Sequence, residues 1–154
     1  MSHLLLAQWR SMTADESDLL VKSSQLSAFI MQTIEDISWA GFYWKRQGQL
    51  VVGAYQGPVA CTRIALDKGV CGNCFTTGKV QIVDDVHSFA GHIACDINSA
   101  SEVVYPLFYD DRCIGVFDID SYKLARFDET IVKEIELICK DFMLTTDFTL
   151  INHW

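Results

Sequence analysis

The sequence lacks the features that mark membrane, fibrous and disordered proteins. Its 154 residues contain only two prolines, and no stretch is repetitive, of low complexity or typical of a linker. No apolar run approaches the length of a transmembrane helix, and the run at residues 4–7 is too short for a signal peptide. Half of the residues are hydrophobic and 21% are charged. This composition predicts one folded domain spanning residues 1–154.

An excess of positive charge is also missing. Lys and Arg number 12 against 20 Asp and Glu, which gives a formal net charge of −8. This balance argues against a nucleic acid or a membrane partner, because no basic patch would offset phosphate charge. Without a signal peptide, we expect a cytoplasmic protein whose thiols are kept reduced. Its six cysteines therefore point to burial, metal binding or redox chemistry.

The hydrophobic pattern predicts an α/β protein of the α+β type. Thr13 and Glu16 have capping-box spacing at the start of a helix of about residues 14–34, and the last helix begins at Asp128. Short helices are expected at residues 4–10 and in the segment that begins near residue 72, where Gly78 ends the helix. The strand-like runs are 37–46, 49–55, 80–84, 102–109 and 112–120. We expect a mostly antiparallel sheet of five to six strands, with the N- and C-terminal helices packed on one face.

Strand alternation places Trp39, Gly41 and Tyr43 on one face of the first strand. Two aromatic rings on either side of a glycine leave a notch with aromatic walls, because glycine has no side chain. The same pattern fits ordinary core packing with a glycine bulge, and this stretch alone favours that simpler interpretation.

Asp118 and Asp120 share one face of the last strand, roughly 7 Å apart. Burying both is costly unless a cation or a hydrogen-bond donor meets them. The pair has two interpretations: the strand end emerges into solvent, or the carboxylates form a receptor for an ammonium group. In the second case Glu102, which opens the neighbouring strand, could join them.

Cys95 lies in the long loop 86–100, next to Asp96. Zinc is one alternative, with ligands drawn from Cys71, Cys74, His87, His92 and Cys95. However, there is no second C-x2-C, and the spacing fits no common zinc finger. The Cys-Gly-Asn-Cys run also lacks the βαβ context of thioredoxin-like proteins. We therefore expect neither a metal nor any other cofactor.

The other cysteines divide into two groups. Cys113 and Cys139 lie in regular elements and are most simply buried thiols. Cys71 and Cys61 lie 24 and 34 residues upstream of Cys95, where loops could bring the three together. One attacking and one resolving cysteine suffice to reduce an oxidised substrate and form an intramolecular disulfide.

Six blocks of sequence carry a resemblance to a known family: SWAGFYW, QGPVACTRI, KGVCG, DVHSFAGHIACD, SEVVYPL and GVFDIDS. In this order and spacing they resemble the free methionine-(R)-sulfoxide reductases, which are single GAF domains. The resemblance implies reduction of free L-methionine (R)-S-oxide to L-methionine, with an intramolecular disulfide recycled by thioredoxin. A homodimer is compatible with it, since GAF domains often dimerise.

The resemblance also implies roles for the cysteines. Cys95 corresponds to the attacking cysteine, and Cys61 and Cys71 to the other two family cysteines. Of these, Cys61 is the expected disulfide partner. Cys74 is an extra thiol that could compete in resolution.

The acids and aromatics take the substrate in this comparison. Glu102, Asp118 and Asp120 correspond to the residues that hold its ammonium group and sulfoxide oxygen. Trp39 and Tyr43 correspond to the aromatic walls around its methyl end. Two departures affect only the packing: Tyr105 and Phe117 stand where aliphatic residues are expected.

The residue types suit this chemistry. Carboxylates crowded beside a thiol raise its pKa and keep one carboxyl protonated, ready to donate to the sulfoxide oxygen as Cys95 attacks. An ammonium group held in a closed notch leaves no room for a preceding residue, which favours a free amino acid over a peptide. The R configuration follows from the resemblance alone. The rival hypothesis is a non-catalytic GAF module that binds a small ligand and has no need of Cys95.

Overall fold

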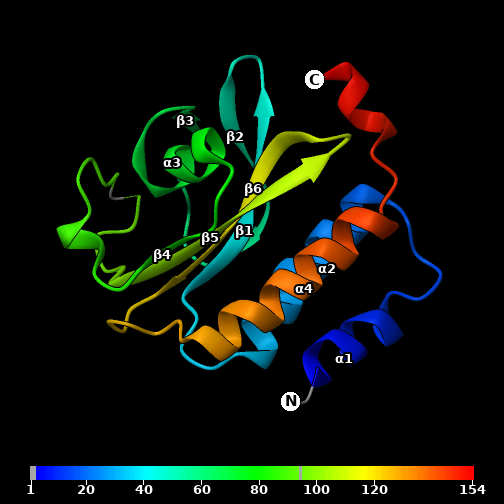
Figure 1. The fold of residues 1–154 in the computed structure, drawn as a ribbon, viewed down its shortest axis with the longest axis horizontal. Coiled ribbons are helices and arrows are strands. Elements are labelled where there is room, and N and C mark those ends of the chain that lie inside the picture. Colours follow the sequence, from blue (N-terminus) through cyan, green and yellow to red (C-terminus); the bar gives the residue numbers. More distant parts are fainter. Residues whose placement is uncertain (1–2, 94) are drawn as a thin grey trace.

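A six-stranded sheet forms the middle layer of the protein (Figure 1). The computed structural model describes residues 3–93 and 95–154. The strands are β1 (Trp39–Arg46), β2 (Gln49–Gln56), β3 (Arg63–Ala65), β4 (Gln81–Val83), β5 (Ser101–Tyr109) and β6 (Arg112–Ser121). Their order is β3-β2-β1-β6-β5-β4, and every neighbouring pair is antiparallel. The predicted sheet is confirmed, and β3 is the strand that the sequence pattern missed.

Helices cover the two faces of the sheet unequally. The helices α1 (Leu4–Met12), α2 (Leu19–Thr33) and α4 (Glu129–Thr145) lie together on one face, while α3 (Gly69–Thr77) lies on the other (Figure 1). The 3₁₀ turns η1 (Val86–Ser88) and η2 (Thr149–His153) complete the elements. The predicted packing of the terminal helices on one face is therefore confirmed. Within the described residues, no helix has the length and apolar character needed to cross a membrane.

Alternation along the strands divides the apolar side chains into two cores. On β1, Phe42 and Trp44 belong to the core under α1, α2 and α4. Trp39 and Tyr43, on the opposite face of the same strand, belong to the core under α3. Because successive side chains point to opposite faces of a strand, the sheet separates the two cores.

The helix α2 begins later than the sequence predicts. Its N-cap is Asp18, whose side chain accepts a hydrogen bond of 3.0 Å from the backbone N–H of Val21. Thr13 instead caps the end of α1 and donates to the carbonyl of Trp9. Glu16 accepts from the next two backbone N–H groups. The capping-box prediction was wrong because Thr13 and Glu16 bond to backbone groups at the end of α1 and in the connection between the helices, and not to those in the first turn of α2.

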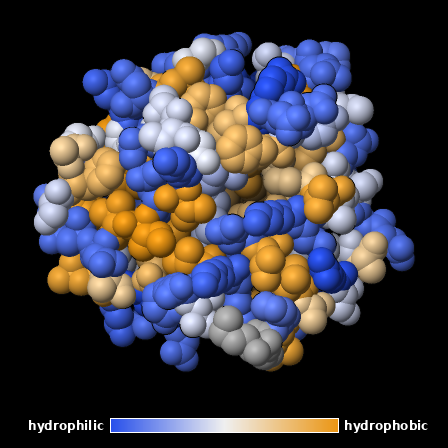
Figure 2. All heavy atoms as spheres, in the orientation of Figure 1, coloured by the Kyte–Doolittle hydropathy of each residue, from blue (hydrophilic) through white to orange (hydrophobic). Residues whose placement is uncertain are grey.

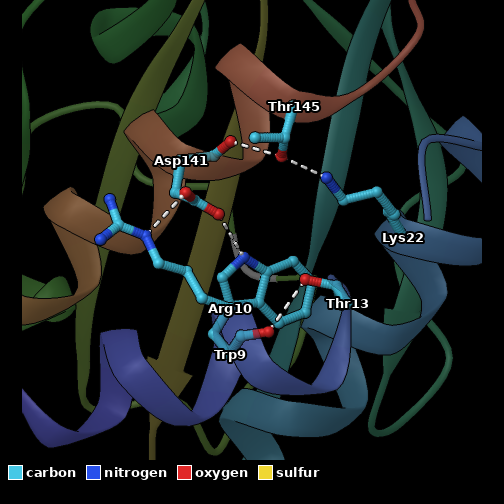
Figure 3. A network of polar contacts seen from close by, with 6 residues as sticks. All are labelled: Trp9, Arg10, Thr13, Lys22, Asp141 and Thr145. Carbon is cyan, nitrogen blue, oxygen red and sulfur yellow. Dashed lines mark hydrogen bonds and ion pairs between the residues drawn. The ribbon is translucent and has the colours of Figure 1, made fainter. Parts of the chain in front are cut away.

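A polar network ties the N-terminal helices to α4 (Figure 3). Asp141 accepts from Trp9 Nε1 at 3.1 Å and from Arg10 Nε at 3.0 Å. Lys22 is fully buried and donates to Thr145, whose hydroxyl donates in turn to the carbonyl of Asp141. Burial lowers the pKa of Lys22, and the charge of Asp141 opposes this effect. These charges are partnered, so α1 and α2 are held in place on the helix side of the sheet.

The surface on the side of Figure 2 is mixed in character. Hydrophobic side chains gather over β4 and β5, and hydrophilic ones cover much of the rest of this face (Figure 2). An apolar groove runs between β5 and α4, where its lining includes Pro106, Phe108, Met143 and Leu144. This groove lies away from the residues predicted to carry chemistry.

Candidate active site

A cleft opens on the α3 side of the sheet. It lies between the first turn of α3, the loop after β2 and the loop 91–99. The predicted site residues that line it are Trp39, Tyr43, Cys71, Cys95, Glu102, Asp118 and Asp120. The remaining predicted residue, Cys61, is bonded to Cys95. Segments far apart in the sequence thus meet at a single opening.

A disulfide joins Cys61 to Cys95, with 5.4 Å between their Cα atoms. The bond links the loop after β2 to the loop that follows η1, across 34 residues of sequence. Cys71 remains a free, buried thiol in the first turn of α3. The structure therefore joins the two cysteines that the family resemblance pairs, with the third thiol lining the same cleft.

The three acids meet because β5, which carries Glu102, pairs with β6, which carries Asp118 and Asp120. Glu102 pairs with Asp120 across β5 and β6, and Asp118 pairs with Gly41 across β1 and β6. Glu102 and Asp118 are each only 6% exposed, and Asp120 is partly buried. This burial excludes the interpretation of a strand end emerging into solvent.

Burial and mutual repulsion keep protons on the acid cluster. Burial raises the pKa of Glu102 well above its ordinary value, and the charge of Asp118 raises it further. The pKa of Asp118 is raised by burial and by Asp120, and that of Asp120 by burial and by Glu102. Burial, followed by the charge of Asp118, also raises the pKa of the Cys71 thiol. Three buried carboxyls this close cannot all ionise without a cation.

The acid cluster has unfilled hydrogen-bonding capacity. Asp118 Oδ1 is buried and has no hydrogen-bond partner in the described structure. No Lys, Arg or His side chain of the described residues forms an ion pair with Glu102, Asp118 or Asp120. A buried carboxylate without a partner is costly. The cluster is therefore suited to a cationic, hydrogen-bonding ligand.

The aromatic walls also hold the loop that carries Cys61. Trp39 and Tyr43 stack with their ring centroids 5.9 Å apart. Trp39 Nε1 donates to the carbonyl of Pro58 at 3.1 Å, and the Tyr43 hydroxyl donates to the carbonyl of Cys61 at 2.9 Å. The register shifts between Gly41 and Tyr43, as a glycine bulge would cause. Trp39 and Tyr55 fill the space beside Gly41, while the rings of Trp39 and Tyr43 line the cleft.

We expect Gly41→Ala to destabilise the protein. A Cβ at this position would overlap the Cβ of Tyr55 and lie 2.7 Å from the ring of Trp39. Forcing an extra methyl group into such packing costs about 1–3 kcal/mol. Urea unfolding should show this loss as a lower unfolding midpoint. An unchanged unfolding midpoint would contradict the close approach of β1 and β2.

The loop around Cys95 is held by a contact that the sequence did not reveal. The Tyr122 hydroxyl donates to Asp96 Oδ2 at 2.9 Å, while Asp96 Oδ1 accepts from the backbone N–H of Asn98. Tyr122 directly follows the strand that carries the acids. No periodicity could have indicated this contact, because it joins a strand end to an irregular loop.

At the start of α3, only Cys71 was predicted from the sequence to be part of the site. Lys68 and Gly69 line the cleft, and Lys68 is an N-cap without a side-chain hydrogen bond. The N–H groups of a helix N-terminus attract anions. The sequence signal for the start of this helix was Gly69, which adopts a positive φ of 67° there.

The ligand set considered for a zinc finger is not assembled. Cys95 is part of the disulfide, and Cys74 donates instead to the carbonyl of Val104. His92 lines the cleft, and burial lowers its pKa. Within residues 3–93 and 95–154, metal-ligating atoms come close together only at a different group, namely Cys71, Glu102 and Asp118.

Comparison with known proteins agrees with this geometry. A model of the GAF domain family matches residues 23–144. The free methionine-R-sulfoxide reductase of Escherichia coli is 40% identical to this chain over 143 residues, covering 91% of this chain and 87% of that protein. The chain belongs to the free methionine-R-sulfoxide reductases of the GAF domain family.

Solved structures of these reductases have the same fold. The fRMsr of Staphylococcus aureus in complex with its substrate is 41% identical, with a TM-score of 0.88 and coverage of 94% of both chains. The enzyme of Neisseria meningitidis in complex with its substrate is 40% identical, with a TM-score of 0.87 and coverage of 92% of this chain and 85% of that one. Within the GAF domain family, the free methionine-R-sulfoxide reductases are the proteins whose chemistry fits this cleft best.

Proposed function

We propose that the protein reduces free L-methionine (R)-S-oxide to L-methionine. The observation that carries this proposal is the buried acid cluster of Glu102, Asp118 and Asp120 in one cleft with Cys95. A zwitterionic amino acid supplies the ammonium group that such a cluster needs. Its sulfoxide supplies the electrophile that a thiol can attack.

The cleft offers a partner for each part of this substrate. The ammonium group offsets the negative charge of the acids and supplies a donor for Asp118 Oδ1. The methyl end packs against the stacked rings of Trp39 and Tyr43. The substrate carboxylate faces the uncapped first turn of α3, where the helix dipole favours an anion. A peptide has no free ammonium group, so the same cleft disfavours methionine sulfoxide within a chain.

The reducing step transfers one oxygen from the substrate to the enzyme. A sulfoxide sulfur becomes a better electrophile when its oxygen is protonated. A protonated carboxyl of the cluster donates this proton while the sulfur of Cys95 attacks. The S–O bond of the substrate breaks, free methionine leaves, and Cys95 carries the oxygen as a sulfenic acid, while the thiol proton of Cys95 passes to the carboxylate and restores its acid form. The substrate sulfur gains the two electrons that Cys95 loses.

The resolving step restores the oxygen as water. The thiol of Cys61 attacks the sulfenic sulfur of Cys95, a disulfide forms and water leaves. The observed bond between these residues supports this assignment. Cys71 is the other candidate for resolution. An external dithiol, for which we propose thioredoxin in the cytoplasm, then returns the pair to thiols.

We infer a homodimer as the assembly, as expected for GAF domains. The molar mass in solution, measured by light scattering, tests this inference.

The function is tested by following NADPH consumption through thioredoxin and thioredoxin reductase, with a metal chelator present. We expect turnover of free methionine-(R)-sulfoxide, at least about a hundredfold slower turnover of the S form, and none of a peptide sulfoxide. Initial rates should follow ping-pong kinetics, because methionine leaves before thioredoxin enters. Sequential kinetics, or equal turnover of both forms, would contradict the scheme.

A further inference from the structure

Three side chains of different elements converge at the floor of the cleft. Cys71 comes from the first turn of α3, Glu102 from β5 and Asp118 from β6. One ligand atom from each, a thiol sulfur and two carboxylate oxygens, lies within 4.8 Å of the other two. All three residues are buried. The group thus has the composition of a metal site and lies on regular elements that hold it in place.

A second observation points independently to a ligand. Asp118 is 94% buried, and its Oδ1 atom has no hydrogen-bond partner in the described residues. The three side chains project into the cleft, and the cleft opens to solvent. An unpartnered buried carboxylate oxygen favours a cation that can enter and leave through this opening.

The donor set selects among cations. Calcium and magnesium need six or more oxygen ligands, whereas one sulfur and two oxygens suit zinc. In a tetrahedral zinc site the ligand atoms lie about 3.4–3.6 Å apart, as follows from zinc–sulfur and zinc–oxygen bonds of about 2.3 and 2.1 Å. Rotation of the two carboxyl groups brings atoms that are now within 4.8 Å to this spacing. The fourth position faces the cleft and takes a water molecule.

We propose that Zn²⁺ binds reversibly to Cys71, Glu102 and Asp118 and inhibits the enzyme by occupying the ammonium site. Binding forms one Zn–S and two Zn–O bonds and releases to solvent the thiol proton of Cys71 and any proton held by Glu102 or Asp118. Zinc here is an inhibitor of the empty enzyme and not a cofactor of the reaction. The competition with substrate rests on the proposed function, whereas the binding of zinc does not.

The metal is tested first in the oxidised protein, in which Cys61 and Cys95 are joined and cannot ligate. Cobalt(II) serves as the spectroscopic probe for the zinc site. We expect one equivalent to give a sulfur-to-cobalt charge-transfer band, which zinc abolishes. Cys71→Ser should lose this band, and calorimetry should show zinc binding at least about tenfold weaker, a loss of about 1.4 kcal/mol.

Cys74→Ser is the matched control. Cys74 lies on the same helix and is also buried, but its thiol points to the carbonyl of Val104. This variant should keep the cobalt band and the zinc affinity of the wild type. A wild-type protein without the band, or a band that persists in Cys71→Ser, would overturn the proposed site.

The competition is measured in a Cys61→Ser/Cys95→Ser double variant, which binds substrate without reducing it. Calorimetry first gives the Kd of free methionine-(R)-sulfoxide. At ten times this Kd, the sulfoxide should raise the apparent Kd of zinc about elevenfold. An unchanged zinc affinity would refute the shared site. Failure of the proposed function is read separately, as absence of turnover in the chelator-containing assay.

Discussion

Cys95→Ser is expected to reduce kcat/KM for free methionine-(R)-sulfoxide at least about a thousandfold. A serine hydroxyl is a far weaker nucleophile than a thiol, and it forms neither a sulfenic acid nor a disulfide. Cys95 lies in an irregular loop that is also held by Asp96, and its own bond is to Cys61 and not to the acids, so the substitution leaves the acid cluster intact. The variant should bind the sulfoxide in calorimetry without releasing methionine.

Cys61→Ser separates attack from resolution. If Cys61 resolves the sulfenic acid, this variant releases about one methionine per chain in a single turnover and then stops. Cys95 then reacts with a sulfenic-acid probe such as dimedone. Cys113→Ser is the control. Cys113 lies at the far end of β6, so this variant should retain full turnover.

Multiple turnovers by Cys95→Ser would refute Cys95 as the proposed nucleophile.

Asp118→Asn is expected to lose activity and gain stability at alkaline pH. Asp118 contributes to the ammonium site and to the proton pool of the cluster, so we expect a loss of about 10²–10⁴ in kcat/KM. Its pKa is raised in the folded state by burial and by Asp120. An asparagine fills the same space without requiring a buried charge. The variant should therefore be more stable than the wild type at pH 8, where the raised pKa of Asp118 lowers the free energy of unfolding of the wild type.

The sign follows from proton binding. Between the ordinary pKa of an aspartate and the raised pKa of Asp118, the folded state holds a proton that the unfolded state has released. The free energy of unfolding therefore falls as the pH rises through this window and levels off above the folded-state pKa. Asp118→Asn should flatten this fall. Wild-type activity should hold across this window and decline only as the pH passes through the raised folded-state pKa, where the folded cluster loses its proton donor.

Urea unfolding of wild type and variant at pH 5 and pH 8, with a chelator present, measures this effect. Asp15→Asn, at an exposed position, should unfold like the wild type at both values. A variant that is less stable than the wild type at pH 8 would show that the Asp118 carboxylate has a stabilising partner. Full activity in the variant would exclude Asp118 from the substrate site.

Strand alternation predicted which face each site residue occupies, but not which strands are neighbours. The faces of Trp39 and Tyr43, and of Asp118 and Asp120, follow from period two within a strand. The meeting of Glu102 with Asp120 depends on the pairing of β5 with β6, which the predicted hairpin supplied. The pairing of β1 with β6 joins residues far apart in the sequence, and no local pattern specifies it.

Two alternatives could be decided only in three dimensions. Whether Asp118 is solvated depends on α3 and the loops that cover the end of β6, and these come from distant segments. The start of α2 depends on which polar side chain accepts from a backbone N–H group of its first turn. Asp18 is the N-cap, whereas the sequence pattern predicted Thr13. The strand β3 has three residues, too few for an alternating pattern to be recognised.

The separation of the two cores by the sheet matters for anyone who wishes to adapt this enzyme to higher temperature. Among the residues that the structure describes, the helix-side core, with Phe42, Phe117 and Phe142, shares no side chain with the core under α3. Substitutions that improve packing on the helix side can therefore raise heat tolerance while the catalytic groups keep their positions. Directed evolution for durability and for substrate range can proceed on opposite sides of one sheet.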